Sequence, residues 1–363
     1  MDIVESTQKY EAWLKQRIPV IQEDLDAKHK AMGEAAFPFL RATFYRWVQL
    51  WRENCADLAS AANVLSIGDL HVENLGTWRD NEGRLVWGIN DFDEAFSAAY
   101  TNDLVRLAAS AQLASQELVL AIRPAEACAA ILDGYHRALD KHGHPFVLAE
   151  EHDHLRAWAT SQMRDPVRFW QKLDELAPLN QIPPDVELHL LKALPEDAAN
   201  IRIVHRTAGL GSLGRQRYTI IADWCGGKIA REAKRLVDSA WTWENTSSPA
   251  GEISYQQIID RAIRNPDPFT KQYNDWLVRR IAPDCFRIEL AELPKERDET
   301  RLLQAMGLET ANIHLGSGPE VANQILQDLS KRPADWLLKA SQVMVKATLK
   351  DWEDWKKSGK QSP

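Results

Sequence analysis

The sequence is poor in cysteine and has no surplus of positive charge. Its 363 residues include four cysteines, which are far apart and form no C-x-x-C pair. This spacing argues against a disulfide framework and against a zinc knuckle, so we expect reduced thiols. Lys and Arg total 44 against 52 Asp and Glu, a net charge of −8, which argues against a nucleic-acid partner bound through overall basic charge.

The sequence also lacks a long apolar run. Its most apolar stretch, residues 104–132, is interrupted by Arg, Gln and Glu, so we expect no membrane span and no membrane partner. The first residues are acidic and lack the basic-then-apolar order of a secretory signal, which favours a cytoplasmic location. Apolar residues make up 45% and charged residues 26%, as in ordinary globular proteins, which excludes a disordered or collagen-like chain.

Hydrophobic periodicity predicts an α+β chain that is mostly helical with a small antiparallel sheet. Apolar side chains three and four residues apart predict helices in residues 8–62, 103–120, 124–139, 148–176, 256–264, 301–315, 321–331 and 334–356. Short β-rich runs predict strands at residues 64–67, 85–89, 201–204, 217–222 and 228–233. The first two strands are expected to pair as a hairpin. Prolines punctuate residues 177–199, which we interpret as a boundary between subdomains.

Two acidic segments each follow an expected strand. Residues 68–74 read Gly-Asp-Leu-His-Val-Glu-Asn, and residues 90–94 read Asn-Asp-Phe-Asp-Glu. If the strand ends bring these segments together, Asp69, Asn74 and Asp91 offer a carboxylate for an attacking hydroxyl group and oxygen ligands for Mg²⁺, as phosphoryl transfer requires. Either segment alone is also compatible with a solvated polar turn. Their shared position at strand ends favours the chemical interpretation.

A third segment is rich in glycine. Residues 209–214 read Gly-Leu-Gly-Ser-Leu-Gly, and a strand-like stretch follows them in place of the helix that a dinucleotide-binding fold requires. Glycines let backbone N–H groups approach phosphates closely. The residues expected to do so are Gly209, Gly211, Ser212 and Gly214. The alternative is a plain β-hairpin with glycine-rich ends.

The acidic segments resemble the aminoglycoside-phosphotransferase-like branch of the protein-kinase-like superfamily. That branch reads G-D-x-H-x-x-N in its catalytic loop and I-D-[FW]-x-[DE]-A in its metal loop, and residues 68–74 and 89–95 are similar to these patterns. The step from Asp69 to Asn74 is that of a kinase catalytic loop, in which the Asp acts as base and the Asn holds metal. The resemblance implies a catalytic Asp69, a metal site formed by Asn74, Asp91 and Asp93, and a loop-bracing Asp103.

Over residues 37–240 the motifs also resemble the bacterial domain of unknown function 2252 (DUF2252) family. The matching pieces are Phe39-Leu40-Arg41, the segments at 68–74 and 90–94, Asp103-Leu104 with Arg106-Leu107, the glycines at 209–214 and Glu232-Ala233. Ordinary kinases have the glycine loop before the catalytic loop, whereas here it follows by about 140 residues. The resemblance therefore implies a two-lobed, circularly permuted protein-kinase-like fold. Its expected parts are a catalytic lobe at 1–198, a nucleotide lobe at 199–245, and a helical region at 246–363 packed on the catalytic lobe.

One departure from that family affects the phosphate-binding cation. The family usually reads Lys-Glu-Ala after the glycine loop, whereas this chain reads Arg231-Glu232-Ala233. Arg is a planar fork and Lys a compact point charge, so the exchange is not neutral. We expect Arg231 at the phosphates, or else Lys228 or Lys234, with Glu232 beside them. Three further residues, Arg41, His71 and Glu94, are expected to contact substrate or to support the loops.

These features predict an ATP- and Mg²⁺-dependent phosphotransferase that acts on an unidentified hydroxyl acceptor, either a small molecule or a protein. Two alternatives stay open. The first is a pseudokinase-like regulatory protein that binds nucleotide without turnover, which the Arg231 departure favours. The second is a metal-dependent hydrolase with its metal on Asp69, His71, Asp91 and Asp93.

Overall fold

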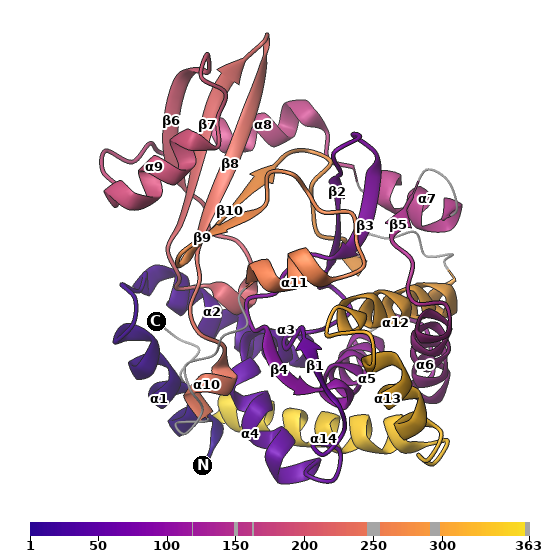
Figure 1. Cartoon of the computed structure of the whole chain (residues 1–363). Helices are drawn as coiled ribbons and strands as arrows, with labels where there is room; N and C mark the ends of the chain where they lie inside the picture. Colours follow the sequence, from indigo (N-terminus) through magenta and orange to yellow (C-terminus); the bar gives the residue numbers. More distant parts are fainter. Residues whose placement is uncertain (118, 149–151, 162, 245–254, 291–297, 360–363) are drawn as a thin grey trace.

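The chain folds into a helical body and a part rich in β-strands, shown in Figure 1. This computed structural model describes residues 1–363 except 118, 149–151, 162, 245–254, 291–297 and 360–363. About half of the described chain is helical, and its sheets are small and antiparallel, so the expected α+β class is confirmed. None of the described helices is long and apolar enough to cross a membrane.

The helical body surrounds the buried helix α5 (Tyr100–Gln116). Beside it, α6 (Pro124–Asp140) and α12 (Glu299–Leu315) cross at two glycines. A Cβ at Gly134 would lie 1.8 Å from the carbonyl oxygen of Gln304, so only glycine permits this approach. The remaining helices of the body are α1 (Ile3–Lys15), α2 (Gln22–Glu34), α3 (Ala36–Ala42), α4 (Phe44–Asn54), α10 (Ala240–Glu244), α13 (Val321–Leu329) and α14 (Trp336–Lys357).

Two small sheets carry the acidic segments. β1 (Asn63–Ser66) pairs with β4 (Phe96–Ala99), and β3 (Leu85–Ile89) lies between β2 (Leu75–Arg79) and β5 (Phe146–Val147). The expected hairpin between residues 64–67 and 85–89 is therefore wrong. The strand that pairs with β3 is β2, which has a glycine at its second position and does not alternate apolar with polar residues. That glycine, Gly76, is required because the carbonyl oxygen of Phe286 would lie 2.4 Å from a Cβ there.

A five-stranded sheet forms the other part, with the order β6-β7-β8-β10-β9. Strands were correctly expected at β6 (Ala199–His205), β7 (Arg217–Trp224) and β8 (Gly227–Arg235), but not at β9 (Lys271–Tyr273) or β10 (Trp276–Ile281). The sheet therefore extends beyond the nucleotide lobe expected at 199–245. In the view of Figure 1 it stands above the helical body.

Helices cover both faces of this sheet. α8 (Pro166–Asp174) packs Phe169 and Leu173 against one face, and α9 (Pro184–Lys192) packs Val186 and Leu190 against the other. α9 lies within the proline-punctuated segment that we interpreted as a boundary, so that segment is part of the packed structure. Two more helices, α7 (Asp153–Ser161) and α11 (Tyr255–Arg261), complete the described elements, and α11 precedes β9.

Candidate functional site

One buried carboxylate fixes the loop that follows β1. Asp103, on α5, accepts hydrogen bonds from the backbone N–H groups of Ile67 at 2.7 Å and Gly68 at 3.1 Å. The Nε2 atom of His314, on α12, lies 3.0 Å from the same carboxylate. These contacts brace residues 66–68, directly before Asp69, from the centre of the helical body.

The buried Arg106 forms an ion pair with the partly buried Asp69 next to residues 209–214, the glycine turn. Arg106 donates to Oδ1 of Asp69 through Nη2 at 2.5 Å and Nε at 3.1 Å, and its guanidinium lies over the rings of Phe44 and Trp47. Burial raises the pKa of Asp69, although Arg106 opposes the shift. The other oxygen, Oδ2, lies 3.3 Å from the position of a Cβ on Gly211. The first acidic segment therefore contacts the glycine turn directly.

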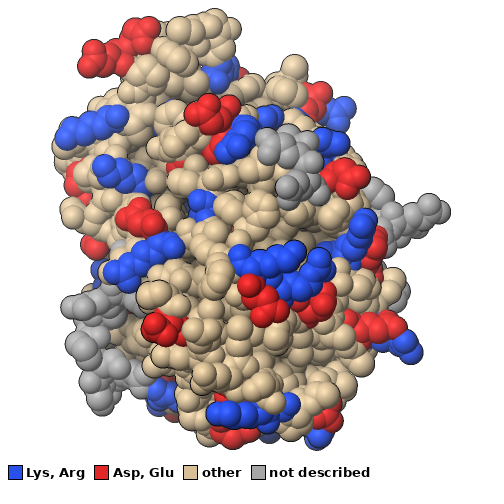
Figure 2. Space-filling model, turned by 45° about the vertical axis from the view of Figure 1, so that its right-hand side comes forward, with Lys and Arg blue, Asp and Glu red and all other residues tan. Residues whose placement is uncertain are grey.

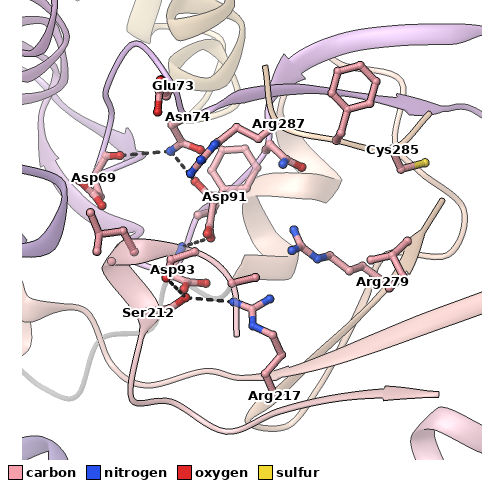
Figure 3. Close-up of a pocket in the computed structure, with 18 of the residues that line it drawn as sticks. Asp69, Glu73, Asn74, Asp91, Asp93, Ser212, Arg217, Arg279, Cys285 and Arg287 are labelled. Atoms are coloured by element: carbon pink, nitrogen blue, oxygen red, sulfur yellow. Dashed lines mark hydrogen bonds between the residues drawn. The ribbon is translucent and has the colours of Figure 1, made fainter. Parts of the chain in front are cut away.

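Asn74 ties the two acidic loops together, as the dashed lines in Figure 3 show. Its Nδ2 donates to the backbone oxygens of Asp69 at 3.2 Å and Asp91 at 2.9 Å. The N–H of Asn90 donates in turn to the backbone oxygen of Asn74 at 3.1 Å. Both donor hydrogens of the amide are thereby used, and its Oδ1 makes no hydrogen bond to any described residue.

Lys234, on β8, binds both carboxylates of the second acidic loop. Its Nζ lies 3.0 and 2.9 Å from the two oxygens of Asp91 and 2.5 Å from Oδ2 of Asp93. Burial disfavours the charged form of Asp91, but Lys234 prevails and lowers the pKa of that carboxyl. Burial and the neighbouring Asp91 raise the pKa of Asp93. Within the described chain, Oδ1 of Asp93 is buried without a hydrogen-bond partner.

Arg215 joins the second acidic loop to the end of the glycine turn. It donates to Oε1 of Glu94 at 3.0 Å and lies 3.4 Å from Oδ2 of Asp93. Glu94 also accepts the backbone N–H of Ala240 at 2.7 Å. Burial raises the pKa of Glu94, although Arg215 opposes the shift. Glu94 is thus saturated by protein donors and supports the loop.

The glycine turn lies against the acidic loops and is held by two cations. Lys28, on α2, donates to the backbone oxygen of Gly211 at 3.0 Å, and Arg217 donates to the hydroxyl of Ser212 at 3.0 Å. Burial and the nearby Arg215 lower the pKa of Lys28 to about 8. Gly209 has a φ of 77°, which favours glycine and starts the turn.

Gly214 lies outside the cavity and anchors the turn. A Cβ there would lie 2.6 Å from a methyl group of Leu25, and its carbonyl oxygen accepts the N–H of Ile21 at 3.0 Å. The last glycine therefore serves the packing of the turn on α2.

A cavity of about 380 Å³ lies between the acidic loops, the glycine turn and the five-stranded sheet. That volume falls in the range of roughly 300–1,000 Å³ typical of small-molecule sites. Its lining has seven Asp or Glu and ten Lys or Arg, a surplus of three positive charges in a chain of net charge −8. The face in Figure 2, by contrast, shows both signs interspersed. The cations are Lys28, Arg41, Arg164, Arg206, Arg215, Arg217, Arg264, Arg279, Arg280 and Arg287.

Three of these arginines surround one carboxylate. Glu232 is fully buried and accepts from Arg206 at 2.7 Å, Arg217 at 2.5 Å and Arg279 at 2.9 Å. Burial disfavours its charged form, but the three guanidinium groups hold its pKa well below the ordinary value. Figure 3 shows Arg217 and Arg279 extending from the sheet toward Asp91. Because one negative charge offsets three positive ones, this group contributes much of the surplus in the cavity.

Two of the cations expected at the phosphates lie elsewhere. Arg231 lies on the α9 side of β8, where its guanidinium stacks 4.0 Å from the ring centre of Phe269. Neighbouring residues of a strand point to opposite faces, so Arg231 cannot share the face of Glu232 and Lys234. Lys228 binds the exposed Asp174 at 2.6 Å. Of the three candidates, the structure brings Lys234 to the acidic loops.

Arg41 and His71 support the first acidic loop. Arg41 lines the cavity and pairs with Glu73 at 2.6 Å, and burial together with nearby Arg287 lowers its pKa to about 10. His71 accepts the N–H of Glu73 at Nδ1, at 3.2 Å, so the ring braces its own loop. Burial, with Arg41 nearby, lowers the pKa of His71 well below its ordinary value, which keeps the ring neutral.

The set expected for a hydrolase does not come together. In the described residues, no three His, Cys, Asp or Glu side chains form a group that could hold a metal ion. Asp69 is bound by Arg106. His71 is engaged within its own loop. This separation argues against a metal held directly by all four residues.

Sequence reasoning missed the cationic wall of the cavity. Outside the cavity lining, a signal existed for Arg106, the partner of Asp69, because it lies in an apolar helix and therefore needs an anion, as Arg41 does. Arg206 and Arg217 flank the glycines closely in the sequence. Arg264 and Arg279 carried no local signal, because their positions depend on how β9 and β10 join the sheet.

The first part of the chain matches a known family model. Residues 19–169 match the family described as "Uncharacterized protein conserved in bacteria (DUF2252)". The match supports the family likeness. It contains the two acidic loops and Asp103, and it ends before the five-stranded sheet. No curated protein and no solved structure matches the chain.

Proposed function

We propose that the chain is an ATP- and Mg²⁺-dependent phosphotransferase with a two-lobed, circularly permuted kinase-like fold, acting on a hydroxyl acceptor. The observation that carries this proposal is that Asp69, Asn74 and Asp91 line the same cavity as the glycine turn. In a kinase, one ATP must reach the glycine loop, the metal ligands and the catalytic base together.

The order of the strands supports the same function. The glycine turn follows β6, and Lys234 lies on β8, the third strand of the run, as the glycine-rich loop and the phosphate-binding lysine do in kinases. Around it, Arg206, Arg217 and Arg279 add a surplus of charge that suits a polyphosphate, since arginine binds phosphate through two parallel N–H groups.

The acidic loops fit Mg²⁺ by their donor chemistry. Mg²⁺ prefers oxygen ligands and is usually held by one or two carboxylates together with substrate phosphates. Asn74 has an unused Oδ1, and Asp93 has a buried Oδ1 without a partner in the described chain. These two residues and Asp91 would hold the ion, which offsets phosphate charge when bound. Asp91 must first release Lys234, which is then available to a phosphate.

Asp69 is oriented for a proton-accepting role. Arg106 engages only Oδ1, which leaves Oδ2 toward the glycine turn. Oδ2 can therefore orient an acceptor hydroxyl group and take its proton. The glycine turn lies beside this oxygen.

The decisive experiment is thermal unfolding of the full chain with Mg²⁺, with ATP, and with both. A ligand at about a hundred times its dissociation constant adds roughly 2.7 kcal/mol of apparent stability, enough to raise the midpoint visibly. We expect a rise that needs both ligands and is lost in Asp91→Ala. No rise with ATP, or a full rise with metal alone, would overturn the proposal.

A matched control separates ligand loss from general destabilisation. Asp351 is a buried carboxylate paired with Arg46 at 2.6 Å, and neither residue lines the cavity. Asp351→Ala should lower the midpoint without ligand but keep the rise with Mg²⁺ and ATP. A measurement of ATP turnover then distinguishes an enzyme from a nucleotide sensor. An enzyme turns ATP over and loses this activity in Asp69→Asn, whereas a sensor binds ATP without turnover.

A further inference from the structure

Arg264 is a half-buried, cavity-lining cation that forms no ion pair with any described residue. Its Nε and Nη1 are fully buried and unpaired, and the structure gives its guanidinium no hydrogen bond or ion pair to any described residue. Burying these two N–H groups without hydrogen-bond partners is costly, because no protein group replaces the water they lose. The other arginines in contact with the acidic loops each have a carboxylate, so Arg264 needs a separate explanation.

Two aromatic rings hold Arg264 in place. Its guanidinium carbon lies 4.5 Å from the ring centre of Trp78 and 5.2 Å from that of Phe92. Trp78 is itself fixed, because its indole N–H donates to the backbone oxygen of Asn265 at 2.7 Å. Cation–π contacts stabilise the charge, but they leave the N–H edge of the fork unused. The guanidinium is thus held in one place, and its N–H groups donate no hydrogen bond to any described residue.

The surroundings add a second cation and no free carboxylate. Arg279 lines the same cavity, as does Tyr255, whose ring packs edge-on against Phe92 with the ring centres 5.3 Å apart and whose hydroxyl donates to the backbone oxygen of Asn90 at 3.1 Å. Of the acidic groups near Arg264, Glu309 accepts from Ile89 and Asn312, and Asp267 pairs with Arg280 at 3.3 Å. The site beside Phe92 and Tyr255 is therefore positive, and it adjoins Asp91.

We propose that Arg264 and Arg279 form an oxyanion subsite at this end of the cavity and that it binds a phosphate group of a small-molecule ligand. A planar fork with unused N–H donors matches the oxygens of a phosphate. The phosphate belongs either to the nucleotide or to a phosphorylated acceptor. Only this question of source rests on the proposed function, since the subsite itself needs neither Mg²⁺ nor nucleotide.

The subsite is tested by calorimetric titration of the full chain with inorganic pyrophosphate, without Mg²⁺ or nucleotide. Loss of a charged, two-pronged contact should weaken binding by about tenfold or more in Arg264→Gln. Arg231 is the matched control, because it also stacks on an aromatic ring and has a buried, unpaired Nε, yet lies outside this cavity. Arg231→Gln should bind pyrophosphate within about twofold of the parent chain.

A stability measurement guards against a variant that simply fails to fold. Since Arg264 makes no hydrogen bond or ion pair with any described residue, Arg264→Gln should unfold at or above the parent midpoint when no ligand is present. Pyrophosphate should then raise the midpoint of the parent chain but not of Arg264→Gln. Equal pyrophosphate affinity in the parent and in Arg264→Gln would overturn the subsite, and so would a lack of binding by the parent.

Competition identifies the source of the phosphate. In a competition with Mg²⁺ present, displacement of pyrophosphate by ATP assigns the group to the nucleotide, and simultaneous binding of both assigns it to the acceptor. The failure of the wider function stays distinguishable, because Asp91→Ala removes the response to Mg²⁺ and ATP but keeps pyrophosphate binding. Pyrophosphate binding without any response to ATP would support the subsite and overturn only the phosphotransferase.

Discussion

The cavity has an acidic face from one short stretch of chain and a basic face collected from distant elements. The acidic face consists of Asp69, Asn74, Asp91, Asp93 and Glu94, within 26 residues of one another in sequence. The basic face consists of Arg206, Arg217, Arg264 and Arg279, which lie on the sheet or beside it. The acidic face falls inside the family match and the basic face outside it.

The two faces also differ in how their charges are balanced. The carboxylates Asp69, Asp91, Asp93 and Glu94 each contact a protein cation. On the basic face, one carboxylate serves three arginines, and Arg264 has no ion pair in the described structure. Each carboxylate of the acidic face is thus paired with a cation, whereas the basic face has more positive charge than its carboxylate offsets. This difference is why a ligand, in our proposal, meets the sheet through its phosphates.

The largest expected effect comes from removing Glu232. Glu232→Gln leaves three guanidinium groups close together without a counter-charge, and breaking such a buried network costs about 3–5 kcal/mol. We expect this loss in the free energy of unfolding measured by urea titration. Pyrophosphate should restore part of it, because the anion takes over the role of the carboxylate.

Asp174 provides the matched comparison for Glu232. It also holds two cations, Arg202 and Lys228, each at 2.6 Å, but it lies on the surface with 42% of its side chain exposed. Asp174→Asn should cost less than about 1 kcal/mol, since solvent screens exposed pairs. A loss in Glu232→Gln no greater than this would show that the arginines are not held by Glu232.

A smaller expected effect is a pH dependence of the free energy of unfolding that comes from the acidic side of the cavity and not from the arginines. Arginines do not titrate near neutral pH, but Glu309, which accepts the N–H of Ile89 behind the acidic face, has its pKa raised to about 6 by burial. Its stabilising contribution is therefore complete below its unfolded pKa, near 4.5, and is lost as pH rises through 6. The shift corresponds to about 2 kcal/mol.

The measurement is the free energy of unfolding from pH 4.5 to 7 in the parent chain and in Glu309→Gln. The other buried carboxylates titrate in both chains, so the difference between the two curves isolates Glu309. We expect the parent curve to fall more steeply than that of the variant. Parallel curves would mean that Glu309 titrates as it does in the unfolded chain.

The contrast between the faces explains what the sequence could predict. Asp69, Asn74 and Asp91 can be predicted from the sequence because each motif is local and follows a strand with clear apolar character. Whether Arg231 or Lys234 faces the cavity depends on which side of β8 is covered by α9. The period of two assigns Arg231 and Lys234 to opposite faces, but it does not say which face is which.

Long-range pairing accounts for the other omissions. β10 carries Arg279 and Arg280 in its middle, so its sequence, Trp-Leu-Val-Arg-Arg-Ile, lacks the alternation of a half-buried strand. Those charges are tolerated because Glu232 and Asp267 meet them across the fold. Only the folded register brings these partners together, and the position of Arg264 follows from the same register.

The smallest expected effect tests whether the site requires close contact between the glycine turn and Asp69, on the acidic face. A Cβ on Gly211 would lie 3.3 Å from both Oδ2 of Asp69 and the backbone oxygen of Arg41, which is tight but not prohibitive. Gly211→Ala should change the free energy of unfolding by less than about 1 kcal/mol, because the strain and the reduced freedom of the unfolded chain offset each other. It should nevertheless weaken the response to Mg²⁺ and ATP by moving the turn away from Asp69. A Cβ on Gly227, the first residue of β8, would have no atom within 4 Å, so Gly227→Ala should leave that response intact. If both variants respond to the ligands alike, close contact between the glycine turn and Asp69 is not what the site requires.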